Sequence, residues 1–456
     1  MQTIETDAII IGAGLTGLTL AFHLIQRGKK VSILEKNDWV GGQIRTFEDN
    51  GFVFESGPNT GAVSYPEVSE LFSALSPACE LETADDNAAH RFIWKDGRFR
   101  ELPTGLISAI TTPLFTFPDK LRILGEPFRP KGTDPDESVG AFALRRLGGK
   151  SFVDYAVDPF LSGVYSGDPN SLITRYALPK LYNLEKNYGG FIKGTFAKMR
   201  EPKTARDRLA TRKIFSARGG LSNLTSALAN AIGKENIVLS VKQIQIRPID
   251  NHWEVTYSTP AGEEKLRAAK MVTTAGGYAL PDLLPFIEKE EMDKISNLRY
   301  APMVQASVGI KNTGGLRFNA FGGLVPSIEK QNVLGILYPA ACFQGRAPKE
   351  GALFSFFIGG IRNSHLTQLS DVELEELVVK NFHRMLKFPS SVSPDMIHIF
   401  RHPRAIPQYE KNSGERLQAI EAIQNRYPGL ILAGNIRNGI GMADRILQAT
   451  TIGKEI

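Results

Sequence analysis

Cysteine is scarce in this chain of 456 residues, which contains only Cys79 and Cys342. Two thiols cannot hold an iron–sulfur cluster or a thiolate zinc site. They also argue against a disulfide framework and for a reducing compartment. The seven histidines show no spacing typical of metal ligands, so we expect no metal centre.

The chain also lacks a basic leader and an uninterrupted apolar run. Residues 1–7 are acidic rather than basic, which is not the pattern of a secretory signal peptide. The apolar stretch 8–25 is broken by three glycines, which favours a strand, a tight turn and a helix over a membrane span. We therefore expect no transmembrane helix and a cytoplasmic protein, with peripheral contact at the cytoplasmic face of a membrane as an open alternative.

The composition is that of a globular protein, with 42% hydrophobic and 22% charged residues. Lysine and arginine exceed aspartate and glutamate by 54 to 48, a net charge of +6. This mild excess suits an anionic substrate, a cofactor phosphate or an anionic membrane surface. Because the basic residues are scattered and no nucleic-acid-binding motif is present, we expect no nucleic acid partner.

The segment 8–35 has the order of strand, glycine-rich turn, helix, strand and acid that is typical of a dinucleotide site. The turn comprises Gly12, Ala13, Gly14, Leu15, Thr16 and Gly17. Its first glycine permits the tight turn, its second admits a pyrophosphate close to the backbone, and its third lets the helix pack on the strand. Glu35, 18 residues after Gly17, is placed to accept hydrogen bonds from an adenosine ribose, and Lys36 follows it in the predicted site.

A second glycine pair follows Glu35, and this motif distinguishes a flavin site from a nicotinamide site. Gly41, Gly42 and Arg45 lie in a segment that resembles the G-G-x-x-R-[ST] element of the flavin amine oxidase and protoporphyrinogen oxidase superfamily. There the glycines and the arginine wrap the diphosphate of FAD, and a nicotinamide enzyme needs no second clamp of this kind. The resemblance therefore implies FAD.

Four further segments make the resemblance more specific. They are 55–59 (ESGPN), 162–168 (SGVYSGD), 321–327 (FGGLVPS) and 405–409 (AIPQY). On these motifs the chain is identified as a member of the oxygen-dependent, FAD-containing protoporphyrinogen oxidase family, with similarity over nearly its whole length.

The resemblance implies an α/β protein, α+β overall, in three parts. A Rossmann-like FAD-binding domain is discontinuous and comprises 1–88, 206–280 and 424–456. A strand-rich substrate-binding domain comprises 281–423 with short flanks near 89–91, and a helical insert comprises 92–205.

The helical insert carries an apolar section, 102–117, that is nearly uncharged. Four basic residues follow it, namely Lys120, Arg122, Arg129 and Lys131. A core helix or substrate lid and a membrane-contacting surface explain this pattern equally well.

By the same resemblance, the reaction is the six-electron oxidation of protoporphyrinogen IX to protoporphyrin IX, a late step of heme biosynthesis. Dioxygen is the acceptor and hydrogen peroxide is released. FAD is expected to be non-covalent, because no cysteine follows Cys342. The expected partners are the porphyrinogen and dioxygen, while a ferrochelatase that takes over the product and a homodimer are further candidates.

The family motifs also assign residues to the site. Arg91 matches the arginine that pairs with a substrate propionate, and Asn59 and Gly163 match positions near the reacting methylene. The lining of the macrocycle slot is matched by Phe321, Leu324, Leu337 and Phe357. Further flavin contacts are expected from Gly57, Pro58, Asn59, Val241, Ala275, Gly434, Ile440, Gly441 and Met442. A helix that starts at Met442 would place its positive end near the reduced flavin. From the residues alone, a surface arginine is the better explanation of Arg91, and plain core is the better explanation of the four apolar residues. Only the family resemblance assigns them to the site.

Other functions stay open at this point. The nearest is coproporphyrinogen III oxidation within the same family. A carotenoid-type desaturase would lack segments 162–168 and 405–409. An amine oxidase often has A-G-E where this chain has Ala433-Gly434-Asn435. A non-catalytic FAD-binding factor that escorts porphyrin to a chelatase is the alternative from a different class.

Overall fold

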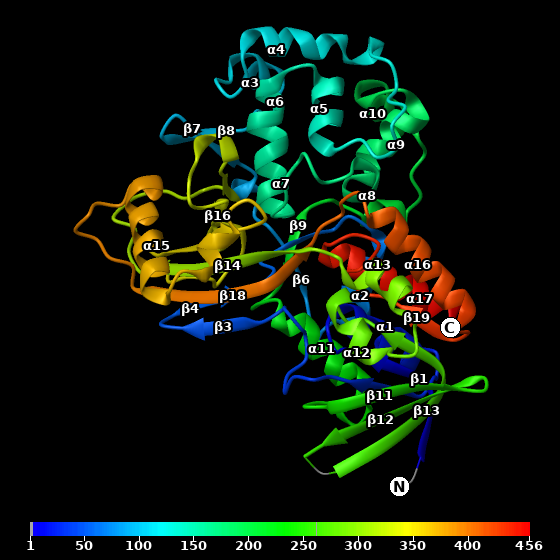
Figure 1. Ribbon diagram of the computed structural model, residues 1–456. Helices are drawn as coiled ribbons and strands as arrows, with labels where there is room; N and C mark the ends of the chain where they lie inside the picture. The colour runs from blue at the N-terminus through cyan, green and yellow to red at the C-terminus, as the bar shows by residue number, and fades with distance from the viewer. Residues whose placement is uncertain (1–2, 261) are drawn as a thin grey trace.

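The structure is a computed structural model that describes residues 3–260 and 262–456. Two seven-stranded sheets form its framework, one at the bottom and one at the left of Figure 1, and a group of helices lies above them. The smaller sheets comprise β3 (Thr46–Asp49) with β4 (Phe52–Glu55), and β5 (Gly61–Ala62) with β9 (Ile214–Ala217) and β6 (Leu81–Thr83).

The first large sheet is built around the predicted nucleotide-binding segment. In sheet order its strands are β10 (Ile237–Val238), β2 (Val31–Leu34), β1 (Thr3–Ile11), β13 (Gly262–Thr273), β12 (His252–Thr259) and β11 (Lys242–Ile249), and β19 (Leu430–Leu432) pairs with β13. The strands β10, β2, β1, β13 and β19 run parallel, whereas β12 and β11 are antiparallel additions. Together with α1 (Leu15–Gln26), this arrangement confirms the predicted strand, turn, helix and strand.

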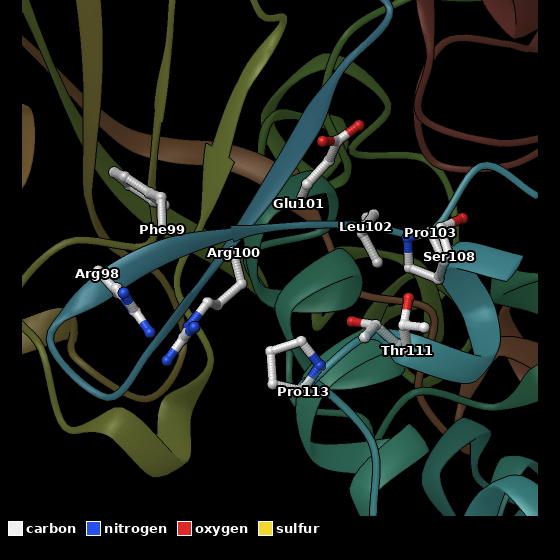
Figure 2. Close-up of a pocket in the computed structure, with 10 residues that line it drawn as sticks. Arg98, Phe99, Arg100, Glu101, Leu102, Pro103, Ser108, Thr111 and Pro113 are labelled. Carbon is white, nitrogen blue, oxygen red and sulfur yellow. The ribbon is translucent and has the colours of Figure 1, made fainter.

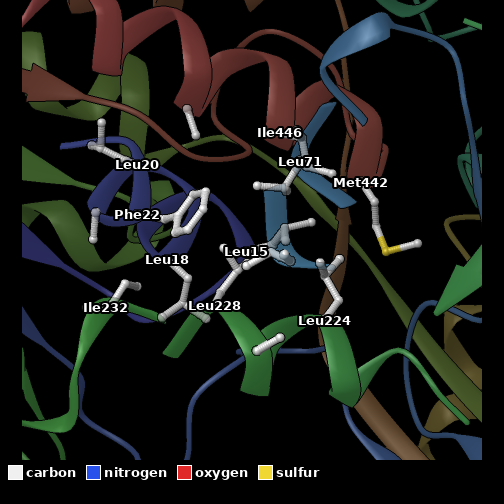
Figure 3. Close-up of a cluster of buried hydrophobic side chains, with 14 of the residues drawn as sticks. Leu15, Leu18, Leu20, Phe22, Leu71, Leu224, Leu228, Ile232, Met442 and Ile446 are labelled. Atoms are coloured by element: carbon white, nitrogen blue, oxygen red, sulfur yellow. The ribbon is translucent and has the colours of Figure 1, made fainter. Parts of the chain in front are cut away.

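Helices cover both faces of this sheet, because a parallel sheet is apolar on both sides. One face packs against α1, α2 (Pro66–Leu75), α11 (Ser222–Ile232) and α17 (Met442–Glu455), and Figure 3 shows their apolar side chains in contact. The other face packs against α12 (Leu280–Leu283), α13 (Lys289–Ser296) and α16 (Ser413–Arg426). The sheet and its helices therefore unite the beginning, the middle and the end of the chain.

The second large sheet has one face that packs against its own helix and another that packs against β4 and the turn after β4. In order its strands are β18 (Met396–Pro407), β14 (Tyr300–Ile310), β17 (Ala352–Gly359), β16 (Gly335–Leu337), β15 (Gly322–Leu324), β7 (Arg91–Lys95) and β8 (Arg98–Glu101). Val304, Phe356 and Ile336 point to the outer face and are fully buried in a core with α15 (Asp371–Leu386). The inner face is described below.

The strands β7 and β8 differ from the predicted domain boundaries, which place residues 92–101 in the helical insert. They form a hairpin whose turn residues Asp96 and Gly97 have φ of +52° and +74°, the positive values that a type I′ turn requires. β15 pairs in parallel with β7, and Ile93 and Trp94 are buried on opposite sides of the strand. Burial of both residues in the sheet explains why this segment is extended.

The remaining insert is helical. It comprises α3 (Leu106–Thr111), α4 (Phe117–Arg122), α5 (Val139–Leu147), α6 (Lys150–Phe152), α7 (Asp158–Val164), α8 (Thr174–Ala177), α9 (Pro179–Tyr188) and α10 (Phe191–Arg200), with a 3₁₀ segment at Ile123–Phe128. No helix within residues 3–260 and 262–456 combines the length and the apolar character needed to cross a membrane.

A buried carboxylate at the end of β4 joins the start of α11, which covers the first sheet, to the second sheet. Glu55 accepts hydrogen bonds from the Arg346 guanidinium (3.0 Å), the Leu221 N–H (2.9 Å) and the Thr46 hydroxyl (2.7 Å). Its backbone carbonyl accepts another from the side-chain amide of Gln305 on β14. Burial raises the pKa of Glu55, while the Leu221 N–H and the Arg346 charge act in the opposite direction. The ion pair therefore counters a large desolvation cost.

We predict that Arg346→Met lowers the free energy of unfolding of the apoprotein by about 3–5 kcal/mol, because it leaves a buried carboxylate without its cation. The loss should shrink as the pH falls. Without the cation the pKa of Glu55 in the folded state rises further above its unfolded value, so proton uptake favours folding at acidic pH.

Urea unfolding at several pH values measures this effect. The control is Arg426→Met, which removes an exposed partner of Glu291 and should cost less than about 1 kcal/mol. If Arg346→Met lowers the free energy of unfolding no more than the control does, the ion pair between Glu55 and Arg346 does not hold α11 and the second sheet together.

Candidate active site

The glycine turn between β1 and α1 has the geometry of a phosphate cradle. Gly12 has a φ of +104°, which favours glycine, and a β-carbon on Gly17 would lie 2.0 Å from the Gly12 carbonyl oxygen. A β-carbon on Gly14 would meet no atom within 4 Å, so open space adjoins the start of α1. Leu15 and Thr16 are buried and offer only their backbone N–H groups to an anion there.

Glu35 is buried beside this turn at the end of β2. Its carboxylate accepts hydrogen bonds from the Ala13 N–H (2.8 Å) and from the backbone and side-chain nitrogens of Asn37 (2.9 and 2.8 Å). A carboxylate offers about four acceptor sites, so Glu35 is held in place and retains capacity for a ribose hydroxyl. Val241 lies next to it and donates its N–H to the Glu35 carbonyl (2.9 Å). Lys36 is exposed, and sequence reasoning overlooked Asn37.

The second glycine pair lies directly against the first turn. Gly41 donates its N–H to the Ala13 carbonyl (2.8 Å), and a β-carbon on Gly42 would lie 3.3 Å from the α-carbon of Gly14. The Arg45 guanidinium stacks on two aromatic rings of the same segment, 4.4 Å from the ring centre of Trp39 and 4.9 Å from that of Phe47. The structure therefore brings together the two elements from which a diphosphate clamp was predicted.

Three parallel strands end at the same place. A β-carbon on Gly12 would lie 2.6 Å from the Thr274 hydroxyl, and one on Gly434 would lie 2.7 Å from the Thr274 carbonyl. Ala275 follows, half-buried, and donates its N–H to the Thr273 hydroxyl (3.2 Å). Ligands of open α/β sheets bind at the carboxyl ends of the strands, so these positions suit a dinucleotide.

The loop 434–441 is held by Arg445, which sequence reasoning missed. Its guanidinium donates to the carbonyls of Gly434, Arg437, Asn438 and Gly439, the last three at 2.8, 2.8 and 2.9 Å. Gln448, one turn along α17, accepts the Gly434 N–H (2.8 Å). Burial lowers the pKa of Arg445. Two polar residues three apart at the start of a helix, after a glycine-containing loop, were the available signal.

Ile440, Gly441 and Met442 lie where this loop enters α17. Gly441 caps the helix and donates its N–H to the Asp444 carboxylate (3.0 Å). Met442 is buried and Ile440 is half-buried. The positive end of a helix of 14 residues thus points at the loop, while the flavin contact of these residues stays a prediction.

The turn after Glu55 packs against the glycine loop, and Asn59 fastens it to the second sheet. A β-carbon on Gly57 would lie 2.2 Å from the Gln43 carbonyl oxygen, which only glycine tolerates. The buried Asn59 amide donates to the Gly57 carbonyl (2.9 Å) and to Gln305 (3.1 Å), and accepts from the Ser355 hydroxyl (2.7 Å). Both amide hydrogens of Asn59 are used in these bonds, so this residue positions the turn. Pro58, between Gly57 and Asn59 in the chain, is half-buried.

The register of the second sheet places Leu324, Leu337, Phe357 and Arg91 on one face, whereas Phe321 packs against a separate cluster of Ala88, Cys342 and Phe343. Residues paired across strands point to the same side of a sheet. One such row joins Gln305, Phe357, Gly335 and Leu324, and the next joins Ser307, Ser355, Leu337, Gly322 and Arg91. We call the face that carries these two rows the inner face.

The inner face changes from polar and buried to apolar and half-open along the sheet. Gln305 and Ser355 have exposed fractions of 1% and 0% and bind the turn that contains Asn59. Leu324, Leu337 and Phe357 are half-buried, although neighbours on the outer face of the same strands are fully buried. An apolar surface in the middle of a sheet is thus left for a ligand to cover.

Gly163 and Arg91 border this apolar surface. A β-carbon on Gly163, in α7, would lie 2.4 Å from the Leu324 side chain, so the helix approaches the sheet closely there. The Arg91 guanidinium is exposed and lies 5.8 Å from the ring centre of Phe321. Within residues 3–260 and 262–456 its side chain forms no ion pair, which leaves its charge available to a ligand anion.

Sequence reasoning also missed Gln305 and Ser355 as partners of Asn59. The signal was present, because both are polar residues inside strands that are otherwise apolar. A buried polar side chain in such a strand needs a hydrogen-bonding partner, but only the fold identifies that partner.

The fold and the glycine cradle are those of a dinucleotide-binding protein with a second, separate sheet. Residues 15–447 match the family model described as "Flavin containing amine oxidoreductase". The chain belongs to this family of flavin oxidoreductases, which implies FAD as the cofactor, and the glycine cradle and Glu35 fit that group.

Curated relatives match over nearly the full length of the chain. The chloroplastic protoporphyrinogen oxidase of Nicotiana tabacum is 30% identical to this chain, and the alignment covers 99% of this chain and 85% of the tobacco protein. Protoporphyrinogen oxidase 1 of Arabidopsis thaliana, also chloroplastic, is 31% identical, covering 96% and 86%. The human protoporphyrinogen oxidase is 28% identical, covering 96% and 95%.

Solved structures share the fold. A crystal structure from Exiguobacterium sp. 255-15 has a TM-score of 0.81 at 21% identity, covering 100% of this chain and 99% of its own. Reduced UDP-galactopyranose mutase has a TM-score of 0.74 at 16% identity, covering 99% and 95%. At these identities the likeness establishes the architecture alone.

We predict that Gly14→Val yields folded protein with less than about a tenth of the wild-type FAD, because its side chain would occupy the open space beside the N-terminus of α1. Flavin absorbance per protein, together with thermal unfolding, measures this. Gly105→Val is the matched control, since a β-carbon there also meets no atom within 4 Å. A Gly14→Val protein that is fully loaded with flavin would contradict the assignment.

Proposed function

We infer that this flavin oxidoreductase converts protoporphyrinogen IX to protoporphyrin IX, with dioxygen as the electron acceptor. The observation that carries the proposal is the apolar, half-open part of the inner face, which ends at an unpaired arginine and begins at the turn beside the flavin cradle. The similarity to protoporphyrinogen oxidases from plants and human over nearly the whole chain supports the same substrate class.

The chemistry of the substrate suits this surface. A porphyrinogen is a large apolar macrocycle with two propionates at one edge, so it requires an apolar wall and a cation at one end. Leu324, Leu337 and Phe357 would supply the wall, and Arg91 would bind a propionate. Gly163 would let α7 approach Leu324 closely, so that the helix borders the wall.

The flavin would be held without a covalent bond. The two glycine elements would surround the diphosphate, and Glu35 would bind the ribose. Burial raises the pKa of Cys79 to about 11 and that of Cys342 to about 12, so neither thiol is a thiolate at neutral pH. This state of both cysteines disfavours attachment through sulfur.

The protein's part in the reaction is to orient the macrocycle and to keep the site dry. When bound, FAD accepts the electrons as three successive hydride equivalents and passes them to dioxygen, with release of hydrogen peroxide. The Asn59 amide has both of its hydrogens engaged, so it would position the turn rather than carry a proton. Solvent water is the proton acceptor in this proposal.

The proposal includes contact of the helical insert with a membrane surface. Ile107, Ile110, Phe117, Leu124 and Phe128 are 60–87% exposed, which is unusual for so many large apolar side chains in one segment. Transfer of the product to a ferrochelatase and a homodimer stay predictions.

We predict that the purified holoprotein, supplied with protoporphyrinogen IX in air, produces porphyrin fluorescence several times faster than the uncatalysed oxidation, and that argon suppresses the increase. Coproporphyrinogen III, tested separately, is the comparison. A faster increase in fluorescence with coproporphyrinogen III would show that the four-carboxylate compound is the preferred substrate. No increase in fluorescence with either substrate, from protein that has FAD bound, would reject a porphyrinogen oxidase.

We predict that Arg91→Ala raises the KM for the porphyrinogen about tenfold, because one charge-assisted contact to a propionate is lost. The kcat and the FAD content should stay unchanged, and Arg91→Lys should recover part of the affinity. Arg247→Ala, on the exposed β11, is the control. Unchanged kinetics in Arg91→Ala would remove Arg91 from the substrate site.

A further inference from the structure

A hollow of about 360 Å³ lies between β8 and α3, and none of its lining residues belongs to the predicted cofactor or substrate set. On one side it is lined by Arg98, Arg100 and Leu102, and on the other by Ser108, Thr111 and Thr112. Figure 2 shows the two arginines on the same side of β8 with their guanidinium groups close together, while Phe99 and Glu101 point to the other side. We call this hollow the Arg98–Arg100 cleft.

The two guanidinium groups have no anionic partner. In the described part of the chain, neither Arg98 nor Arg100 forms an ion pair or a side-chain hydrogen bond, and the Nε of Arg100 is buried without an acceptor. Glu101 is engaged elsewhere, with His90 (2.6 Å). A buried donor without an acceptor is costly, and two adjacent like charges repel each other. Both costs are relieved when an anion binds between the arginines.

A third cation and a hydroxyl add to the same environment. Lys95 donates to the carbonyls of Pro113 and Leu114 (2.9 and 3.0 Å), and Pro113 lines the cleft. The Thr112 hydroxyl accepts the Leu114 N–H (3.2 Å) and keeps its own proton for another acceptor. Glu101 also lines the cleft, but Figure 2 shows its side chain on the other side of β8, and it pairs with His90. The arginines and the hydroxyl groups of the lining therefore offer donors and positive charge to the cleft.

The basic residues that the sequence places after the apolar section are committed to the fold. Lys120 donates to the carbonyls of Ile110 and Thr112, Lys131 to that of Lys186, and Arg122 pairs with Asp119. Arg129 donates to the carbonyls of Arg146 and Arg122. In contrast to these four, Arg98 and Arg100 have guanidinium groups free for a ligand.

Exposed apolar side chains adjoin the cleft on the same short helix. Ile107 and Ile110 are 80% and 60% exposed and alternate in α3 with Ser108 and Thr111, which line the cleft. The bonds from Lys120 tie α4, which exposes Phe117, to α3. An anion site at the edge of an exposed apolar surface matches a molecule with a phosphate next to hydrocarbon.

We propose that the Arg98–Arg100 cleft binds the phosphate of an anionic phospholipid while Ile107 and Ile110 enter the apolar layer of the membrane. This extends the membrane contact proposed above by naming the group that is recognised. It does not depend on the oxidised substrate, because vesicle binding is measured without turnover.

Flotation of the holoprotein with vesicles tests the proposal, using phosphatidylcholine alone or mixed with phosphatidylglycerol. Arg98→Gln/Arg100→Gln should weaken binding to the mixed vesicles roughly thirtyfold, as expected for the loss of two cations at an anionic surface. It should leave binding to pure phosphatidylcholine, the FAD content and the thermal unfolding unchanged. Ile107→Ser/Ile110→Ser should weaken binding to both kinds of vesicle.

The matched control is Lys242→Gln/Arg247→Gln, which removes the same charge from the exposed β11. If this control loses as much vesicle affinity as Arg98→Gln/Arg100→Gln, the effect is one of net charge and the proposal is overturned. Wild-type binding by Arg98→Gln/Arg100→Gln would overturn it as well.

A soluble headgroup separates the lipid from a free phosphate. Glycerol 1-phosphate, titrated by calorimetry, should bind only weakly without the apolar contacts. If glycerol 1-phosphate binds saturably and needs both arginines, while vesicle binding does not need them, the cleft binds a soluble phosphate compound. This result would reject the phospholipid.

Discussion

The rest of the structure depends on the buried carboxylate of Glu55. Its oxygen atoms bind groups from β3, from the start of α11 and from the loop before β17, and its carbonyl binds β14. A buried charge is tolerated only when such partners are in place. The arrangement therefore holds the turn that follows Glu55, and with it Asn59, between α11 and the second sheet.

From this junction the inner face continues as one rigid surface. Its polar end, at Gln305 and Ser355, is buried against the turn beside the cofactor cradle, and its apolar end lies open at Phe357, Leu337 and Leu324. Sites carried on strands hold their groups more precisely than sites on loops. The apolar end of the sheet and the turn beside the cofactor cradle are thus held in one arrangement by the bonds of Asn59.

The hairpin of β7 and β8 links this surface to the outside of the molecule. Arg91 lies on the inner face, and the pairing of Arg100 with Ile93 and of Arg98 with Lys95 places both arginines on the same face, at the sheet edge beside α3. The insert stabilises itself with internal ion pairs, such as the buried one between Arg146 and Glu126. Its apolar core includes Leu161 and Leu172, while Ile107 and Phe128 are exposed on its surface.

The sequence by itself determined the nucleotide half of this protein. The glycine turn, Glu35 and the second glycine pair act through backbone geometry over short distances, so their spacing along the chain already predicts the cradle. Arg91 and the apolar residues of the inner face were predicted through resemblance rather than through physical derivation, and their contact with a substrate stays a prediction. Only the tertiary structure decided that 92–101 is a hairpin in the second sheet, that Glu55 meets Arg346, and that Arg98 and Arg100 remain unpaired. Those features depend on contacts between residues far apart in the chain, which strand register and burial establish and which local pattern does not encode.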